Sequence, residues 1–247
     1  MYFIDTHIHL QAYNAKTAPQ IISEAAACDV QKLVCAAVTE ADWQMIGGWA
    51  EKYPQAVVPA FGIHPWYLET LSNGWQGRLA EQLERFPQAL IGETGLDRSR
   101  NPEPEPQAEV FRIHLELAEQ FDRPLLIHAV KAWDWLEAYW PQLRERRFVI
   151  HSFNARREQL DKIIKAGGYV SFSNSICRNR DFAALAAAVP AEKLLFETDG
   201  PFQGPEGKDS HPCQIAALCA KVAATRPEPA ADLAARVYMN SLRFINV

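Results

Sequence analysis

The chain has 247 residues, of which 48% are hydrophobic, and this is enough for one large core of strands and helices. Its formal net charge of -5 at pH 7 excludes the broad basic surface of an architectural nucleic-acid-binding protein, so any polyanion must be held locally. No apolar stretch approaches the roughly 20 residues of a membrane span, and the start MYFIDTHIHL is unlike a secretory signal. We therefore expect a cytoplasmic protein.

Short apolar segments, often rich in β-branched residues, alternate along the chain with longer polar segments of helical spacing. This rhythm is typical of repeated strand–helix units with a parallel sheet. The predicted strands lie near residues 2–8, 31–38, 56–62, 89–95, 124–128, 147–151, 168–173 and 193–199. Eight such units predict an α/β fold, namely a TIM-like (β/α)8 barrel formed by residues 1–247 as a single domain.

Between the strands, the clearest helices are predicted over residues 106–121, which carry an apolar stripe, and 212–224, which are rich in alanine and leucine. The proline-rich segment 101–106 predicts a loop that enters a helix. An open doubly wound sheet is the structural alternative, but the glycine-rich phosphate loop of that fold is absent from the sequence.

The five cysteines form an odd set without a C-x-x-C pair. Such a set is typical of reduced thiols in a reducing compartment, where most free cysteines are small core or surface residues. We therefore expect no disulfide among Cys28, Cys35, Cys177, Cys213 and Cys219.

The first predicted strand carries three polar side chains at alternate positions. Asp5, His7 and His9 in the segment FIDTHIHL project from one face, because side chains alternate across a strand. That face can line the interior of a barrel. Two histidines so spaced at a strand end can both reach one cation, although buried histidines without a metal are also common.

Later strands also end on residue types that bind metals. The segments GETGLD, PLLIH, FVIH and LLFETD close the fourth, fifth, sixth and eighth strands and contribute Glu93, His128, His151 and Asp199. The carboxyl ends of barrel strands meet at one mouth, where burying so many polar groups without partners would be costly. Cations would satisfy these groups together, so the pattern predicts a metal site.

The candidate ligands outnumber the four or five that one ion needs, and this predicts two divalent cations. We assign His7, His9 and Asp199 to the first ion, His128 and His151 to the second, and Glu93 to both. Open positions would hold water, which becomes nucleophilic because metal binding lowers its pKa. Asp199 could also take the proton of that nucleophile.

These motifs make the whole chain resemble the TatD-type metal-dependent deoxyribonucleases, part of the amidohydrolase-like barrel superfamily. The resemblance rests on D-x-H-x-H-L at 5–10, G-I-H-P at 62–65, G-E-T-G-L-D at 92–97, P-L-L-I-H at 124–128, H-S-F at 151–153 and E-T-D-G-P at 197–201. It implies that the same six residues bind the ions, which in this family are usually magnesium, manganese or zinc. It also implies phosphodiester hydrolysis, with exonuclease activity on DNA in some members.

The resemblance further places His64 beside the metals, where it would contact a bound phosphate. Trp66 and Phe202 follow site motifs and could form a stacking wall for a base, although packing at the rim explains them at least as well. His114 lies within a predicted helix, and we expect it to be a solvated surface residue.

The chain departs from the family pattern in loops that would hold the substrate. Val130 stands where the family often has an arginine, with Lys131 next to it. Ser210-His211-Pro212 replaces the familiar Asn-Glu-Pro after the eighth strand. The resemblance therefore supports the metal site more firmly than it supports the recognition of any one substrate.

Basic residues follow four consecutive predicted strands, namely Arg98 and Arg100, Lys131, Arg156 and Arg157, and Arg178 and Arg180. Such residues are often only solvated surface, but loops after barrel strands open on one mouth. A positive rim there would attract a phosphate chain and offset the net charge locally. We predict substrate contacts from Arg98, Lys131 and Arg178, together with His64.

The predicted activity is hydrolysis of DNA or a small phosphoester, with Asp199, Glu93 and His64 as the catalytic residues. One alternative is a metal-dependent hydrolase of another bond, such as a phosphomonoester or a C–N bond. Related amide-cleaving sites often have a modified lysine where Glu93 stands, and this favours phosphodiesters. The other alternative is a metal-binding barrel without activity. We expect no membrane association and no obligate protein partner.

Overall fold

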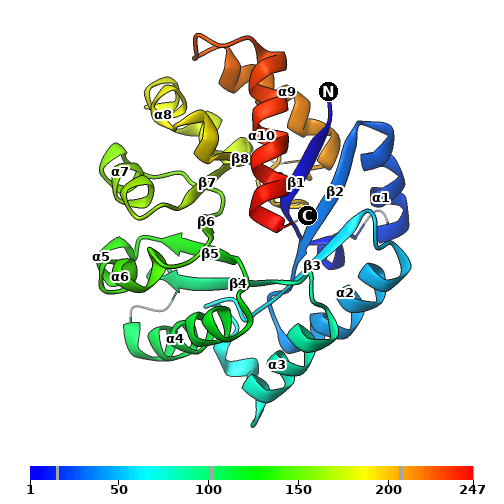
Figure 1. Ribbon diagram of the computed structural model, residues 1–247, viewed down its shortest axis with the longest axis vertical. Coiled ribbons are helices and arrows are strands. Elements are labelled where there is room, and N and C mark those ends of the chain that lie inside the picture. Colours follow the sequence, from blue (N-terminus) through cyan, green and yellow to red (C-terminus); the bar gives the residue numbers. More distant parts are fainter. Residues whose placement is uncertain (15–16, 101–102, 206–207, 247) are drawn as a thin grey trace.

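The computed structural model describes residues 1–14, 17–100, 103–205 and 208–246, and it consists of a parallel sheet of eight strands with helices outside it (Figure 1). Neighbouring strands pair in sequence order, from the first to the eighth. The strands are β1 (Phe3–Ile8), β2 (Val30–Ala36), β3 (Val57–Phe61), β4 (Leu90–Asp97), β5 (Leu125–Val130), β6 (Phe148–Ile150), β7 (Tyr169–Phe172) and β8 (Leu194–Phe196). The predicted (β/α)8 barrel is confirmed.

Helices connect successive strands around the outside of the sheet, and two further helices follow the last strand (Figure 1). They are α1 (Ala18–Ala27), α2 (Glu40–Lys52), α3 (Trp75–Arg85), α4 (Pro104–Phe121), α5 (Trp133–Leu136), α6 (Trp140–Leu143), α7 (Arg157–Lys165), α8 (Phe182–Ala188), α9 (Ile215–Ala223) and α10 (Ala230–Ile245). Capping boxes at Thr17 and Thr39 satisfy free amides at the first turns of α1 and α2. The two helices predicted most clearly correspond to α4 and α9.

Hydrogen bonds between β1 and the segment after β8 close the barrel at the carboxyl ends of the strands. The Asp199 amide donates to the carbonyl of His7 (2.9 Å), and the His9 amide donates to the carbonyl of Gly200 (2.8 Å). Below them, the buried carboxylate of Asp5 accepts from the amide and the hydroxyl of Thr198. The closure therefore brings the candidate ligands His7 and His9, in and just after β1, beside Asp199, which follows β8.

The interior of the barrel is apolar at the amino ends of the strands. Ile4, Leu90 and Leu195 belong to this inner cluster, and Phe244 and Ile245 at the end of α10 complete it. A second, larger apolar cluster lies between the strands and the surrounding helices. Because α10 fills one mouth with apolar side chains, polar groups can gather only at the opposite mouth.

Strands β4 and β5 approach each other closely beside Glu93. A Cβ atom on Gly95, whose φ is +147°, would lie 2.0 Å from the carbonyl oxygen of His128. A Cβ atom on Gly92 would lie 2.6 Å from the carbonyl oxygen of Leu126. Only glycine fits these positions, and the close pairing brings Glu93 near His128.

The prediction for His114 is wrong, because this side chain is fully buried. Its Nε2 accepts from the amide of Ile63 (3.1 Å), its Nδ1 lies 2.7 Å from the carbonyl oxygen of Val110, and its ring stacks on Trp75. Burial lowers the pKa of His114 to about 4, against the opposing effect of the Val110 carbonyl. The imidazole therefore ties α4 to the end of β3 in its neutral form.

The expectation of five reduced thiols is also wrong, because Cys28 at the end of α1 forms a disulfide with Cys213. The two residues are 185 positions apart, and only the barrel brings them together. Cys35, Cys177 and Cys219 are free. Among the described residues, no helix is long and apolar enough to cross a membrane. The cytoplasmic location stays a prediction.

Candidate metal centre

All six predicted ligands lie together at the carboxyl ends of the strands, and all six are buried. They come from β1 and its end (His7 and His9), β4 (Glu93), β5 (His128), and the segments that follow β6 (His151) and β8 (Asp199). Glu93 and His128 lie within strands rather than at their ends, because β4 and β5 pair as far as Asp97 and Val130.

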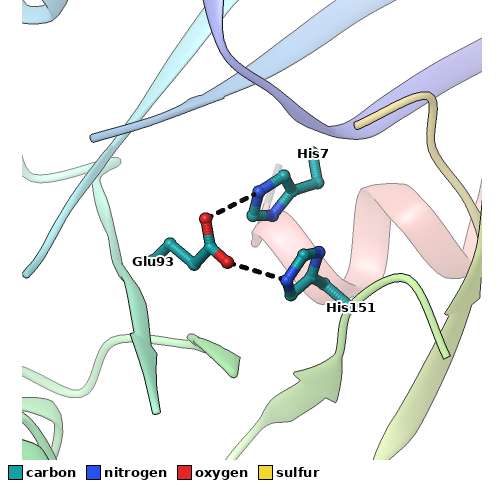
Figure 2. A group of neighbouring side chains, drawn as sticks. All are labelled: His7, Glu93 and His151. Carbon is teal, nitrogen blue, oxygen red and sulfur yellow. Dashed lines mark ion pairs between the residues drawn. The ribbon is translucent and has the colours of Figure 1, made fainter. Parts of the chain in front are cut away.

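The carboxylate of Glu93 lies at the centre of this group, and its two oxygens face different histidines. Its Oε2 lies 3.3 Å from His7 Nε2 and 3.4 Å from His9 Nε2. Its Oε1 lies 2.8 Å from His151 Nε2 and 2.9 Å from His128 Nδ1. Figure 2 shows the carboxylate beside the stacked rings of His7 and His151, with one oxygen directed at each ring. A carboxylate so placed would offer one oxygen to a cation on each side.

Imidazole nitrogens also face each other on each side of Glu93. His7 Nε2 and His9 Nε2 are 3.1 Å apart, and His128 Nδ1 and His151 Nε2 are 3.2 Å apart. Only one nitrogen of each pair can donate a hydrogen bond to the other, and their lone pairs converge beside carboxylate oxygens. A cation would satisfy both nitrogens of a pair at once, so the residues fit divalent metal ions.

Asp199 completes the side that contains the two histidines of β1. Its Oδ1 lies 3.3 Å from His9 Nε2 and 3.8 Å from His7 Nε2. These three residues form one compact group of possible ligand atoms, and His7, Glu93 and His151 form another. The first group agrees with the assignment of His7, His9 and Asp199 to one ion, whereas the second joins His7 to His151, a residue assigned to the other ion. The assignment of ligands to two ions stays a prediction.

Both carboxylates are ionised in this environment. Burial raises the pKa of Glu93, but the surrounding histidines, His151 first, outweigh burial and hold this pKa well below its ordinary value. Burial also raises the pKa of Asp199, but a hydrogen bond with His9 and the nearby imidazoles lower it overall. The centre therefore offers charged oxygens to a cation.

His64 lies beside the same carboxylate, as its predicted role requires. Its Nε2 is 3.3 Å from Glu93 Oε1 and 3.3 Å from His128 Nδ1, and its Nδ1 accepts from the amide of Trp66. Burial lowers the pKa of His64 to about 4, since the attraction of Glu93 only partly compensates. His64, Glu93 and His128 form a third group of possible ligand atoms, and contact of His64 with a phosphate stays a prediction.

Two further carboxylates lie behind the histidines, and the sequence analysis did not single them out. Asp97 Oδ2 is 2.8 Å from His128 Nε2, the nitrogen that faces away from Glu93, and it also accepts from the indole of Trp66 (2.7 Å). Glu197 Oε1 lies 3.4 Å from His151 Nδ1 and accepts from a backbone amide. Such carboxylates orient a ligating imidazole and increase its basicity.

Replacement of Asp97 by asparagine should weaken metal binding without removing a ligand. The neutral amide would hold the ring of His128 less firmly and would withdraw the negative charge behind it. We expect a loss of about 10- to 100-fold in affinity for one divalent ion, measured by calorimetric titration of the metal-free protein. Asp134→Asn is the matched control, because Asp134 is exposed and pairs with Arg98 on the surface. Equal affinities in the two variants would contradict the positioning role of Asp97.

The predicted basic rim is only partly brought to the metal centre. Arg178 lines a cavity together with His128, His151 and Asp199, and its guanidinium donates to Gln203. Lys131 lines a larger cavity nearby. Arg98 instead pairs with Asp134, and its guanidinium lies over the ring of Trp135 (4.4 Å). Substrate binding by Arg98 therefore has no support from its surroundings, and all three contacts stay predictions.

Aromatic side chains line the other side of the centre. Trp66, Tyr67 and Phe202 line a cavity of about 240 Å³ that is also lined by five of the six ligand candidates, all except His7. The exposed ring of Phe202 meets the ring of His9 edge to face, at 5.6 Å between centroids. Both aromatic residues named for a stacking wall thus border the centre, and their contact with a base stays a prediction.

The profile of the family described as TatD related DNase matches residues 4–246, which is nearly the whole chain. The chain belongs to this family. Among TatD-related proteins, the 3'-5' ssDNA/RNA exonuclease TatD of Erwinia tasmaniensis is 28% identical over 252 residues, covering 94% of this chain and 95% of that protein. The metal-dependent hydrolase YjjV of Escherichia coli K12 is 29% identical, with 99% of this chain and 98% of that protein covered.

Solved structures of TatD-related proteins share the fold. The crystal structure of YjjV from Escherichia coli superposes with a TM-score of 0.91 at 28% identity, covering 99% of this chain and 98% of that chain. A TatD-family hydrolase from Entamoeba histolytica superposes with a TM-score of 0.88 at 18% identity, covering 99% and 98%, which shows the fold alone. The resemblance noted in the sequence is thus confirmed at the level of family and fold.

Proposed function

We propose that this chain is a divalent-metal-dependent phosphodiesterase that cleaves single-stranded nucleic acid at a centre of two ions. The observation that carries the proposal is the carboxylate of Glu93, whose oxygens face two separate pairs of histidines. Relatives named as metal-dependent hydrolase and as ssDNA/RNA exonuclease support the metal and the substrate class. His7, His9, Glu93, His128, His151 and Asp199 are the proposed ligands.

The donor set bears on which metal is bound. Four imidazoles and two carboxylates favour zinc over magnesium, because imidazole is a preferred ligand of zinc whereas magnesium prefers oxygen. Manganese accepts both types of donor and is the next candidate. We propose zinc or manganese as the working ion, with magnesium as the weaker binder.

The residues of the centre divide the work of hydrolysis. Divalent cations at such a site polarise a phosphoryl oxygen and make water nucleophilic at neutral pH. Asp199 lines both the cavity that contains Phe202 and the cavity that contains Arg178. Its carboxylate can take the proton of the attacking water there. His64, neutral and beside Glu93, can donate a hydrogen bond to a phosphate oxygen.

The test is an assay of metal-stripped protein reloaded with zinc, manganese or magnesium. We expect about two ions per chain by elemental analysis and cleavage of a single-stranded oligonucleotide that a chelator abolishes. Phosphomonoesters and amides serve as comparison substrates. Preferred cleavage of one of these would support another hydrolase, and two bound ions without turnover on any substrate would support a barrel that only binds metal.

A further inference from the structure

A cavity of about 610 Å³ opens between the loops that follow β5, β6 and β7, and we call it the β5–β7 groove. In Figure 1 these loops lead into α5, α7 and α8, which lie along one side of the barrel. Three cationic side chains line the groove, one from each loop: Lys131, Arg156 and Arg180. The groove therefore concentrates positive charge on one side of an acidic protein.

The groove adjoins the metal centre. A neighbouring cavity of about 270 Å³ is lined by His128, His151 and Asp199. The groove and this cavity share four lining residues, namely Ala129, Val130, Ser152 and Asn154. A chain whose scissile phosphate lies at the metal centre can thus continue into the groove.

The cations of the groove are available to a ligand. Within the part of the chain that the structure describes, neither Lys131 nor Arg156 forms an ion pair. Arg180 lies 3.7 Å from its sequence neighbour Asp181, and 88% of its side chain is exposed. Asp181 is the one carboxylate among the described residues that line the groove. By contrast, Arg157 forms an ion pair with Asp161.

The floor of the groove is ordered by amide side chains. The Asn179 side chain donates to Asn154 Oδ1 (2.8 Å) and to the carbonyl of Ala155 (3.2 Å). Asn154 in turn donates to the carbonyl of Ser175 (3.2 Å). These bonds tie the loop after β6 to the loop after β7, so the cations of the two loops are held on a common frame.

The two sides of the metal centre differ in chemistry. The cavity on one side is lined by three aromatic rings, those of Trp66, Tyr67 and Phe202. The groove on the other side is lined by three cations and three amide side chains, and Trp133 is the one aromatic ring among its described lining residues. Bases stack on aromatic rings, and backbone phosphates follow positive grooves. This asymmetry matches a strand whose terminal nucleoside lies among the aromatic rings and whose remaining phosphates lie in the groove.

We propose that the β5–β7 groove binds the backbone phosphates of a single-stranded polynucleotide beyond the phosphate at the metal centre. The inference rests on the proposed function and deepens it, because it makes a strand, rather than a small phosphoester, the preferred substrate. Lys131, Arg156 and Arg180 are the phosphate contacts.

The test compares two triple variants that lose the same charge. Lys131, Arg156 and Arg180 are replaced by glutamine in the groove variant, and Arg78, Arg85 and Lys162 in the control variant. The control cations lie on α3 and α7, and each forms an ion pair there. Cleavage is measured on a twelve-residue oligothymidylate and on bis(p-nitrophenyl) phosphate, with the metal-loaded protein. Binding is measured by fluorescence anisotropy with a phosphorothioate oligothymidylate that resists cleavage.

In the groove variant, we expect KM and Kd for the oligonucleotide to rise about tenfold or more. The slope of log binding constant against log salt should flatten by about two, since each phosphate contact on a single strand contributes about 0.7. The loss on bis(p-nitrophenyl) phosphate should be much smaller. The control variant should keep the parent's KM, Kd and salt slope on the oligonucleotide.

Two outcomes separate this inference from the proposed function. If the parent cleaves the oligonucleotide and both triple variants match it, the groove does not bind the strand and only this inference fails. Equal losses in the two variants would also overturn it, because the effect would then be general charge. If the parent binds the oligonucleotide through the groove cations but does not cleave it, the groove inference holds and the proposed phosphodiesterase activity fails.

Discussion

Asp199→Asn should lower kcat for oligonucleotide cleavage by about 10²- to 10⁴-fold, the usual contribution of a positioned general base. The amide has the size of the carboxylate but cannot accept a proton in the transition state. The carboxylate of Asp199 is ionised in the parent, because contact with His9 and the nearby imidazoles lowers its pKa against the effect of burial. The group that is lost is therefore a charged carboxylate, the form that the proposed role of proton acceptor requires.

The same substitution should change KM much less than kcat, since Asp199 acts on the nucleophile and not on the rest of the strand. Metal content must be measured in parallel, because Asp199 is also a proposed ligand of the ion at His7 and His9. Asp161→Asn, an exposed carboxylate of α7, controls for the change in net charge. An unchanged kcat at full metal occupancy would remove Asp199 from the mechanism.

The barrel and its metal centre were predictable because both follow from repeated local patterns. Five of the eight apolar strands, β1, β4, β5, β6 and β8, contain or end near a ligand-type residue, and parallel strands in a barrel bring their carboxyl ends together. The carboxylates behind the histidines follow from the alternation of side chains along a strand. Asp97 lies four residues after Glu93, and Glu197 lies two residues before Asp199, so each shares the face of its segment with a ligand.

The burial of His114 follows from its position on the apolar face of α4. It lies three residues after Phe111 and four after Val110, on the stripe that α4 buries. A histidine on such a stripe must find buried partners, and the free amide of Ile63 supplies one. Because histidine is polar, we expected His114 to be exposed to solvent. Its position on the buried stripe of α4 instead places the side chain in the interior.

Other features depend on tertiary contacts that no local pattern contains. Cys28 and Cys213 meet only because α1 lies beside the segment that precedes α9. The direction of each basic side chain on the rim is decided by its neighbours. Asp134 and Trp135 hold Arg98 outside the cavities, whereas Lys131 finds no such anchor among the described residues. The sequence therefore predicts which loops lie at the mouth of the barrel, but it does not predict which basic side chains in those loops face the cavities.

Glu93→Gln should cause the largest loss of bound metal, because Glu93 is the one proposed ligand shared by both ions. The substitution removes a charge from a buried group of four histidines and replaces one carboxylate oxygen with an amide nitrogen. That nitrogen cannot bind a cation and would point at imidazole nitrogens that are themselves ligands. We expect fewer than one ion per chain and a fall in kcat/KM of at least about 10³-fold, equivalent to roughly 4 kcal/mol.

A comparison of metal content across variants tests the bridge itself. His128→Ala removes a ligand from one side only, so it should lose mainly one of the two ions and keep the other. Glu93→Gln should lose both, since Oε2 faces His7 and His9 while Oε1 faces His128 and His151. His211→Ala is the control, because that histidine lies outside the centre and contacts Glu24. Two firmly bound ions in Glu93→Gln would show that each metal is held by its own histidines without a shared carboxylate.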